Sequence, residues 1–236
     1  MKHILKLLIL LFGFGVLQSQ SLIGAWQNDH VSELGEALTS VLIVADGYQV
    51  ITTYNSQTGA FIHTNGGTWE LQGNIMTETV EFDTNNADLV GKTVSFEIDL
   101  TDDTFQIVDD SRKFKRIDNG TPGKLSGAWL MSGRMRDGNL ESRPTNTPRK
   151  TMKILSGTRF QWIAYNTETK QFMGTGGGTY TTIDGKYTEQ IEFFSRDVSR
   201  VGAALEFNFN LKDGHWHHEG LSSKGDPIYE VWSVRE

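Results

Sequence analysis

The chain repeats itself, and the repeat is the feature that most restricts its fold. Leu22-Ile23-Gly24-Ala25-Trp26 returns as Leu125-Ser126-Gly127-Ala128-Trp129. From Tyr54-Asn55, which returns as Tyr165-Asn166, the offset settles at 111. Two copies of one domain are predicted, each of about 100 residues and large enough to bury its own core. A shared fold cannot explain the positions where the copies differ, so these differences point to chemistry.

Residues 1–20 have the pattern of a secretory signal peptide. Lys2 and Lys6 precede an apolar run from Leu7 to Leu17, and the small polar stretch Gln18-Ser19-Gln20 follows. We therefore expect a secreted or periplasmic protein. The apolar run is too short to cross a bilayer and no second run follows, so no membrane span is expected. The chain contains no cysteine, so neither disulfides nor a cysteine-linked lipid anchor can form.

The charge balance argues against one class of partner. The formal charge is −7, and removal of Lys2 and Lys6 with the signal peptide brings it to −9. Nucleic-acid binding depends on neutralising phosphates with lysine and arginine, so DNA and RNA are not expected as partners. A small anion remains compatible, because a local basic pocket is sufficient to bind it.

Short alternating segments dominate both halves, separated by turn signals such as Asp46-Gly47 and Asp184-Gly185. With no long amphipathic helix, this pattern predicts an all-β fold of two tandem antiparallel barrels. We place the first barrel at residues 21–118, a linker at 119–124 and the second barrel at 125–236. We expect the first barrel to be structural and the second to be active.

The second copy contains a basic insertion. Trp26 and Tyr54 are 28 positions apart, whereas Trp129 and Tyr165 are 36 apart, so the second copy gains eight residues there. The basic residues around the insertion are Arg134, Arg136, Arg143, Arg149 and Lys150. They predict a long basic loop over one barrel mouth, with an ordinary solvated loop as the alternative.

The sharpest difference between the copies is a histidine cluster. Thr104-Phe105-Gln106-Ile107 becomes His215-Trp216-His217-His218. On a strand, Trp216 and His218 point to one face, and His215, His217 and Glu219 point to the other. Trp216 aligns with the apolar Phe105, so His218 is predicted inside the barrel, where an imidazole can act as general base or acid. His217 is the second candidate base. A metal held by the outer residues, or a surface position for some histidines, are the competing interpretations.

A second strand offers a candidate acid. Tyr187, Glu189, Ile191 and Phe193 fall on one face, which the apolar members mark as interior. Tyr187 replaces Met76 of the first copy, so a hydroxyl that can donate a proton is added only in the second. Glu189 repeats Glu78, which favours a structural role in which the carboxyl is paired or protonated, and we also include Glu189 among the candidate substrate-binding residues.

Several further residues could bind a substrate. Arg196 and Arg200 could hold a carboxylate or sulfate, although Arg196 with Asp197 could equally be a surface pair. Trp162 and Tyr180 could stack on a sugar ring or simply pack in the core. Lys224 matches Lys113 of the first copy at the offset of 111, which makes it structural or common to both barrels. The run Gly176-Gly177-Gly178 continues a strand, so it predicts a β-bulge or close backbone approach and not a phosphate loop.

The motifs also resemble known proteins. The Gly-x-Trp at the start of each copy resembles the lipocalin-like (calycin) superfamily. The segments that resemble a family of secreted bacterial lipocalin-like proteins are Phe160-Gln161-Trp162-Ile163-Ala164-Tyr165-Asn166, Thr175-Gly176-Gly177-Gly178-Thr179-Tyr180, Glu192-Phe193-Phe194-Ser195-Arg196-Asp197, Ser199-Arg200-Val201-Gly202 and Ser223-Lys224-Gly225-Asp226-Pro227-Ile228-Tyr229-Glu230-Val231-Trp232. Within it the chain is similar to oligosaccharide dehydratases of marine ulvan degradation.

That resemblance implies an activity on anionic oligosaccharides, in which water is eliminated from the uronic acid at the non-reducing end. His217 or His218 would be the base, Tyr187 the acid, and Arg196 with Arg200 the carboxylate clamp. We expect no cofactor and no metal. The alternatives are a non-catalytic binding protein for a glycan or small hydrophobic ligand, and a haem or metal binder that uses the histidines.

Overall fold

A computed structural model describes residues 21–236, so the predicted signal peptide lies outside the described residues. Seventeen strands and two short 3₁₀ turns are found there, and every strand pairing is antiparallel. The elements of the first half are β1 Gly24–Val31, β2 Ala37–Ala45, β3 Tyr48–Asn55, β4 Phe61–Gln72, β5 Ile75–Asp83, η1 Ala87–Leu89, β6 Thr93–Leu100, β7 Thr104–Ile107 and β8 Lys113–Asp118. Those of the second half are β9 Gly127–Arg136, β10 Asn139–Ser142, β11 Arg149–Leu155, β12 Arg159–Asn166, β13 Gln171–Ile183, β14 Lys186–Phe194, η2 Val198–Arg200, β15 Ala204–Lys212, β16 His215–Leu221 and β17 Pro227–Val234.

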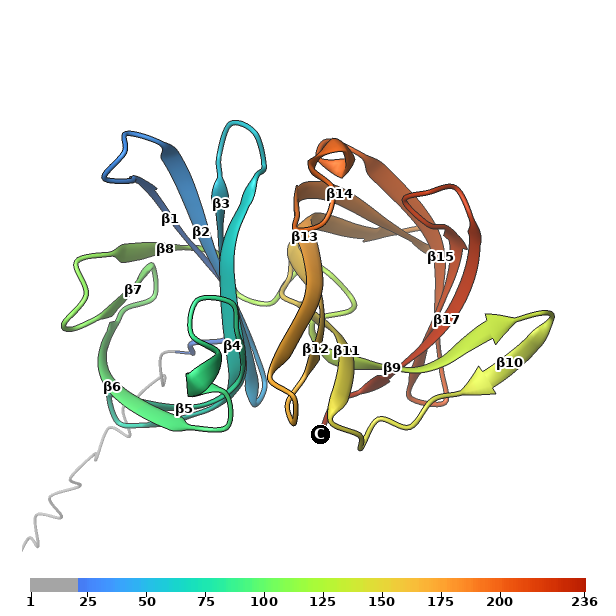
Figure 1. Ribbon diagram of the computed structural model, residues 1–236, viewed down its shortest axis with the longest axis horizontal. Helices are drawn as coiled ribbons and strands as arrows, with labels where there is room; N and C mark the ends of the chain where they lie inside the picture. Colours follow the sequence, from blue (N-terminus) through green and yellow to red (C-terminus); the bar gives the residue numbers. More distant parts are fainter. Residues whose placement is uncertain (1–20) are drawn as a thin grey trace, which may run out of the picture.

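The strands form two eight-stranded barrels that stand side by side (Figure 1). The first is a meander of β1 to β8 closed by pairing of β8 with β1. The second runs through β9 and β11 to β17 and is closed by pairing of β17 with β9, while β10 forms a hairpin on the extended end of β9. The predicted all-β fold of tandem antiparallel barrels is confirmed. Among residues 21–236, no helix is long and apolar enough to span a membrane.

Each barrel has its own core, built from the inward-facing residues of alternating strands. Trp26 anchors the first and Trp129 the second, and each indole donates to a main-chain carbonyl four residues earlier, that of Leu22 or Leu125. The other large members of the second core are Leu155, Phe160, Tyr180, Tyr187, Phe207, Trp216 and Trp232. The second interior is therefore markedly more aromatic than the first.

A β-bulge lies opposite the glycine run in both copies, as predicted from Gly176-Gly177-Gly178, and the extra residues are Glu81 and Glu192. The register shifts between Gly177 and Gly178, and equally between Gly66 and Gly67. A Cβ at Gly178 would lie 2.0 Å from the carbonyl oxygen of Gln190, so no larger residue fits there. The bulge also corrects one expectation. Tyr187, Glu189 and Ile191 face the interior, but the extra residue turns Phe193 outward onto the other barrel.

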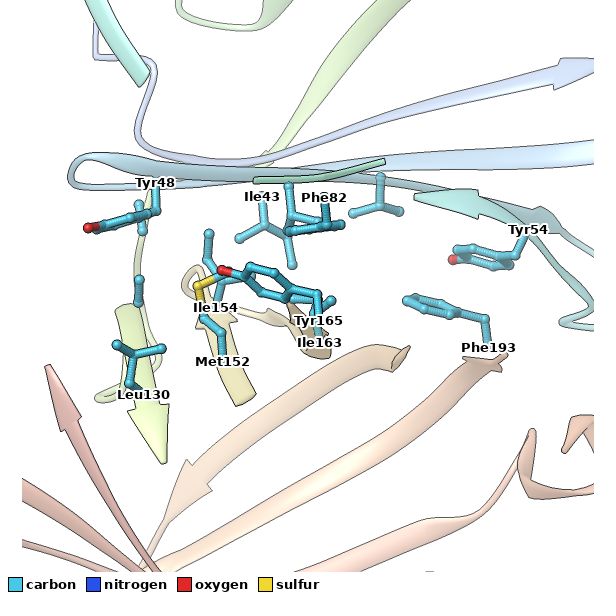
Figure 2. Packing of buried hydrophobic residues seen from close by; sticks show 14 residues of the cluster. Ile43, Tyr48, Tyr54, Phe82, Leu130, Met152, Ile154, Ile163, Tyr165 and Phe193 are labelled. Atoms are coloured by element: carbon cyan, nitrogen blue, oxygen red, sulfur yellow. The ribbon is translucent and has the colours of Figure 1, made fainter. Parts of the chain in front are cut away.

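A third apolar cluster lies between the barrels, where β11 packs on β2 and β3 and β5 packs on β12 and β13 (Figure 2). Equivalent residues of the two copies meet there in a reciprocal way. Tyr54 stacks on Phe193 with ring centroids 5.0 Å apart, and Tyr165 packs on Phe82 at 4.8 Å. Both pairs obey the offset of 111, so the interface has the self-complementary pattern of a twofold dimer within one chain.

Two clusters, each of a tyrosine, a glutamate and an arginine, stabilise the same interface. The Tyr54 hydroxyl donates to Glu192 at 2.7 Å, and the Tyr165 hydroxyl donates to Glu81. An arginine completes each cluster, Arg159 on Glu192 and Arg235 on Glu81. Burial and the neighbouring carboxylate raise the pKa of both tyrosines, so both hydroxyls stay protonated. The conserved spacing of these motifs between the copies thus reflects the interface between the barrels.

The connection from β8 to β9 closes one end of the second barrel. Asp118, the last residue of β8, accepts hydrogen bonds from the Ser156 hydroxyl at 2.8 Å and from the amides of Gly157 and Thr158, both at 2.9 Å. The Tyr180 hydroxyl donates to the Ser156 carbonyl in the same turn at 2.6 Å. The opposite end lacks this connection and is called the open end below.

Candidate active site inside the second barrel

Five ionisable side chains gather inside the second barrel. Lys153 comes from β11, Tyr187 and Glu189 from β14, His218 from β16 and Glu230 from β17. Lys153 is 5% exposed, Glu189 4%, His218 1% and Tyr187 0%. Burial of that many ionisable groups is costly unless they are paired, so their presence requires a reason beyond packing.

The first barrel shows that the fold does not need most of these groups. Lys153 pairs with Trp129 across the strands, and at the same place in the first barrel Leu42 pairs with Trp26. Tyr187 corresponds in the same way to Met76, and His218 to Ile107. Three apolar positions of the first interior have thus become lysine, tyrosine and histidine in the second.

Glu189 is the one interior acid that both copies share, and it receives two donors in the second barrel. The Lys153 ammonium lies 2.8 Å from Glu189 Oε1, and the Tyr187 hydroxyl donates to the same oxygen at 2.8 Å. Burial, and then the charge of Glu189, raise the pKa of Tyr187 well above its usual value, so this phenol holds its proton at neutral pH.

Four aromatic rings lie near the Lys153 ammonium. The ring centroids of Tyr187 and Trp216 lie 5.0 Å from Nζ, Trp232 lies at 5.3 Å and Phe207 at 5.8 Å. Aromatic faces attract a cation, and they do so more strongly when water is excluded. The arrangement fixes a positive charge at the centre of the barrel.

His218 is buried next to this centre, as the sequence predicted. Its ring packs on Phe207 with a centroid separation of 4.1 Å, and its Nδ1 lies 3.5 Å from Glu230 Oε2. That separation is too long for a well-formed hydrogen bond, and within residues 21–236 neither ring nitrogen has a hydrogen-bond partner. Burial, and then the charge of Lys153, lower the pKa of His218, so the imidazole is neutral at pH 7 and able to accept a proton.

His217 lies on the outer wall, away from these groups. Its Nδ1 lies 2.8 Å from the Tyr229 hydroxyl, and with His215 it lines a surface groove of about 440 Å³ beneath the β10 hairpin. Within residues 21–236, no group of three or more histidine, cysteine, aspartate or glutamate side chains is placed to hold a metal ion. Of the two predicted bases, only His218 lies with the buried ionisable groups.

The predicted aromatic residues both belong to the second barrel's core region. Tyr180 is 3% exposed and bound to the Ser156 carbonyl at the closed end. Trp162 is half-buried and packs edge-on against Phe194 at 5.4 Å. The rings of Trp162 and Phe194 lie over Gly176, where a Cβ would meet them at less than 3 Å. Trp162 therefore remains a candidate for sugar contact. The Tyr180 hydroxyl is used in a structural hydrogen bond to the Ser156 carbonyl.

The predicted cationic residues lie outside the interior. Arg196 is exposed and donates to the Met173 carbonyl, whereas Arg200 binds Asp197 at 3.1 Å and the Ser223 carbonyl. Lys224 is exposed in the turn before β17. Its match to Lys113 is wrong, because Lys113 occupies the register position of Val231 and the last turn of the second copy is longer.

Sequence reasoning missed Lys153 and named Glu230 only within a motif. Lys153 could have been found, because it lies 111 positions after Leu42 in an otherwise apolar alternating stretch. Glu230 could not be aligned in the same way, since the longer last turn shifts the offset in that strand. Its role beside His218 becomes visible only in the closed barrel.

A scan against models of protein families and a search of curated proteins gave no match to this chain. The two closed barrels are consistent with a lipocalin-like fold. Since barrels of this type host many functions, the fold does not choose among them. The functional argument must therefore come from the residues of the second interior.

Proposed function

We propose that the second barrel is an acid–base site that eliminates water from the terminal uronic acid of anionic oligosaccharides, in a secreted or periplasmic setting. The observation that carries this proposal is the replacement of Leu42, Met76 and Ile107 by Lys153, Tyr187 and His218 at equivalent interior positions. A base, an acid and a cation are thereby added together to a core that folds without them.

The roles follow from the protonation states. Neutral His218 removes the proton on the carbon beside the uronate carboxylate, and that electron pair forms the new carbon–carbon double bond. The bond to the neighbouring hydroxyl breaks as protonated Tyr187 gives its proton to the departing oxygen, and water leaves. Lys153 holds the carboxylate while negative charge builds on it. Glu189 positions Lys153 and Tyr187, and Glu230 orients the His218 ring.

The closed end and the deep burial restrict the substrate. Because the connection from β8 to β9 covers one end, a chain cannot thread through the barrel and only its end can enter, which agrees with a reaction on the terminal residue. The four nearly buried groups are reached only when side chains at the open end move aside, with Trp162 in position to contact the incoming sugar. We therefore expect long polymers to be poor substrates and short oligosaccharides to be good ones.

The test is to incubate the protein with uronate-terminated oligosaccharides and follow the ultraviolet absorbance of the conjugated double bond. His218→Gln should reduce turnover by about 10²- to 10⁴-fold, the usual contribution of a general base. His217→Gln is the matched control, because it changes the same side chain one position away on the outer wall, and it should leave turnover unchanged. Wild-type turnover in His218→Gln would refute the assignment.

A non-catalytic binding protein is the second candidate, and the completeness of the Lys153–Glu189 pair favours it. Both partners are nearly fully buried and satisfy each other, as a purely structural pair would. In that case, the same oligosaccharides would bind without forming a double bond. Calorimetry run beside the absorbance assay separates the two functions.

A further inference from the structure

Arginines collect at the open end of the second barrel. The antiparallel order of the strands brings four connections to this end, residues 137–148, 167–170, 195–203 and 222–226. The first of them contains the insertion that the first copy lacks, and it adds a hairpin that projects from the barrel at β10 (Figure 1). Arg143 belongs to this insertion, whereas Arg134 in β9 and Arg149 at the start of β11 flank it.

Arg134 is linked to the buried site by strand register. It pairs with Glu230 across β9 and β17, and Glu230 pairs with His218 across β17 and β16. Directly paired residues share one face of a sheet, so all three belong to the inner face, with Arg134 exposed at the rim. Burial alone would raise the pKa of Glu230, but His218, Lys153 and Arg134 together lower it, so the carboxylate is charged.

Arg143 reaches the same rim from the other side of the insertion. Its amide donates to the Ser132 carbonyl at 2.7 Å, and its Nη1 lies 3.2 Å from the sulfur of Met131, a core residue of the second barrel. Partial burial, and then the nearby Arg149, Arg134 and Arg136, lower the pKa of Arg143. This guanidinium is therefore held against the interior among like charges.

The positive charge at this rim is only partly neutralised, because Glu230 is the carboxylate that acts on Arg134 and Arg143. Of these arginines, Arg136 has a carboxylate within 4 Å, that of Glu141 at 3.6 Å, whereas Arg134, Arg143 and Arg149 form no ion pair within residues 21–236. Like charges gathered at a barrel mouth repel one another, and a bound anion relieves that repulsion. A second observation points the same way, since the buried His218 on this face has two ring nitrogens without a partner in the described chain.

We propose that Arg134 and Arg143 form a guanidinium clamp that binds an anionic group of the ligand, a carboxylate or a sulfate ester, and holds the terminal sugar above His218. A guanidinium presents paired donors that match either anion. The part of this proposal that concerns the reaction rests on the proposed function, whereas the binding of the anion is tested independently of it. The clamp is supplied by Arg134 of β9 and Arg143 of the insertion. It is not supplied by Arg196 and Arg200, whose donors are used on main-chain carbonyls and Asp197.

The experiment measures binding by calorimetry with three probes, a glucuronate-terminated disaccharide, the same disaccharide with a sulfate ester, and a neutral disaccharide. The variants are Arg134→Gln/Arg143→Gln and, as a control that removes two exposed charges from the first barrel, Lys113→Gln/Lys115→Gln. We expect the arginine variant to lose about tenfold or more in affinity for the anionic probes and to show a weaker salt dependence. The lysine variant should bind like the wild type.

The probes also identify the anion. An equal loss for both acidic disaccharides assigns the clamp to the carboxylate, and a loss confined to the sulfated one assigns it to the sulfate ester. Unchanged affinity in the arginine variant, or a wild type that binds the neutral disaccharide as well as the acidic ones, overturns the proposal. Matching thermal melts of the variants and the wild type exclude misfolding as the cause.

Turnover separates the clamp from the proposed function. If both are correct, the arginine variant raises KM about tenfold, because the clamp binds the anion of the incoming sugar. A clamp on a sulfate ester leaves kcat within twofold, whereas a clamp on the uronate carboxylate also lowers kcat, since charge builds on that group. Binding that depends on the arginines without any double-bond formation supports the clamp and refutes the proposed function. Turnover with unchanged KM in the arginine variant refutes the clamp alone.

Discussion

Glu78 offers a quantitative test of how the two interiors differ. It occupies the position of Glu189, but the first barrel has Leu42 where the second has Lys153. Glu78 is 7% exposed, and within the described chain its Oε1 has no hydrogen-bond partner. Burial raises its pKa from 4.5 to about 7, although the neighbouring Gln49 amide opposes the shift. Glu78→Gln keeps the shape and removes the ionisation.

The sign and size of the effect follow from the shift. Because the pKa is higher in the folded state, the native protein binds this proton more tightly, so the contribution to stability is complete below pH 4.5 and is lost as the pH rises through 7. At about 1.4 kcal/mol per pKa unit, the loss is about 3 kcal/mol. Glu78→Gln should therefore gain about 3 kcal/mol relative to the wild type between pH 4.5 and pH 8.

Urea denaturation at several pH values, followed by tryptophan fluorescence, measures this difference. A difference between Glu78→Gln and the wild type that stays constant from pH 4.5 to pH 8 would refute the reasoning. Glu189→Gln is the matched comparison and should behave in the opposite way. It leaves the buried Lys153 ammonium without its partner, so it should destabilise the protein by about 3–5 kcal/mol at neutral pH.

Three further outcomes are expected. Asp118→Ala should lower the free energy of unfolding by about 3 kcal/mol or more, because the Ser156 hydroxyl and the amides of Gly157 and Thr158 lose their acceptor. A change below about 1 kcal/mol in urea denaturation would contradict this. Gly178→Ala should abolish the native near-ultraviolet circular dichroism, since its Cβ collides with a carbonyl oxygen, and a wild-type spectrum would show that the bulge can relax. Turnover should persist below pH 6.5, because burial and Lys153 lower the pKa of His218 despite the opposing effects of Glu230 and Glu189. A rate that halves at pH 6.5 would instead indicate that the pKa of the base is not lowered.

Strand period and repeat alignment were sufficient to predict the barrels and the inward direction of His218, Tyr187 and Glu189. They failed where one extra residue changes the direction of a side chain. Phe193 was placed inside by simple alternation, but the bulge opposite Gly177 and Gly178 sends it to the other barrel. A two-residue period cannot locate such a bulge, although the glycines suggested one.

The candidate site was predictable only in part, for a related reason. His218 and Tyr187 stand out because they replace apolar residues within aligned strands, and the same comparison could have found Lys153. Glu230 comes near His218 only through pairing of the last two strands, after the offset has changed. Alternation along β16 also predicts that His217 faces outward and His218 inward, but it does not predict the groove that His217 lines.

The reciprocal contacts of Tyr54 with Phe193 and of Tyr165 with Phe82 have a consequence for the division of labour in this chain. Two identical barrels that paired through this face would carry two identical interiors, and a change in one would change both. Once the two are joined in one polypeptide, each sequence can vary alone while the shared face holds them together. The first barrel can keep a largely apolar core in which Glu78 is the buried acid, and the second can accept several buried ionisable groups while the shared interface stabilises both.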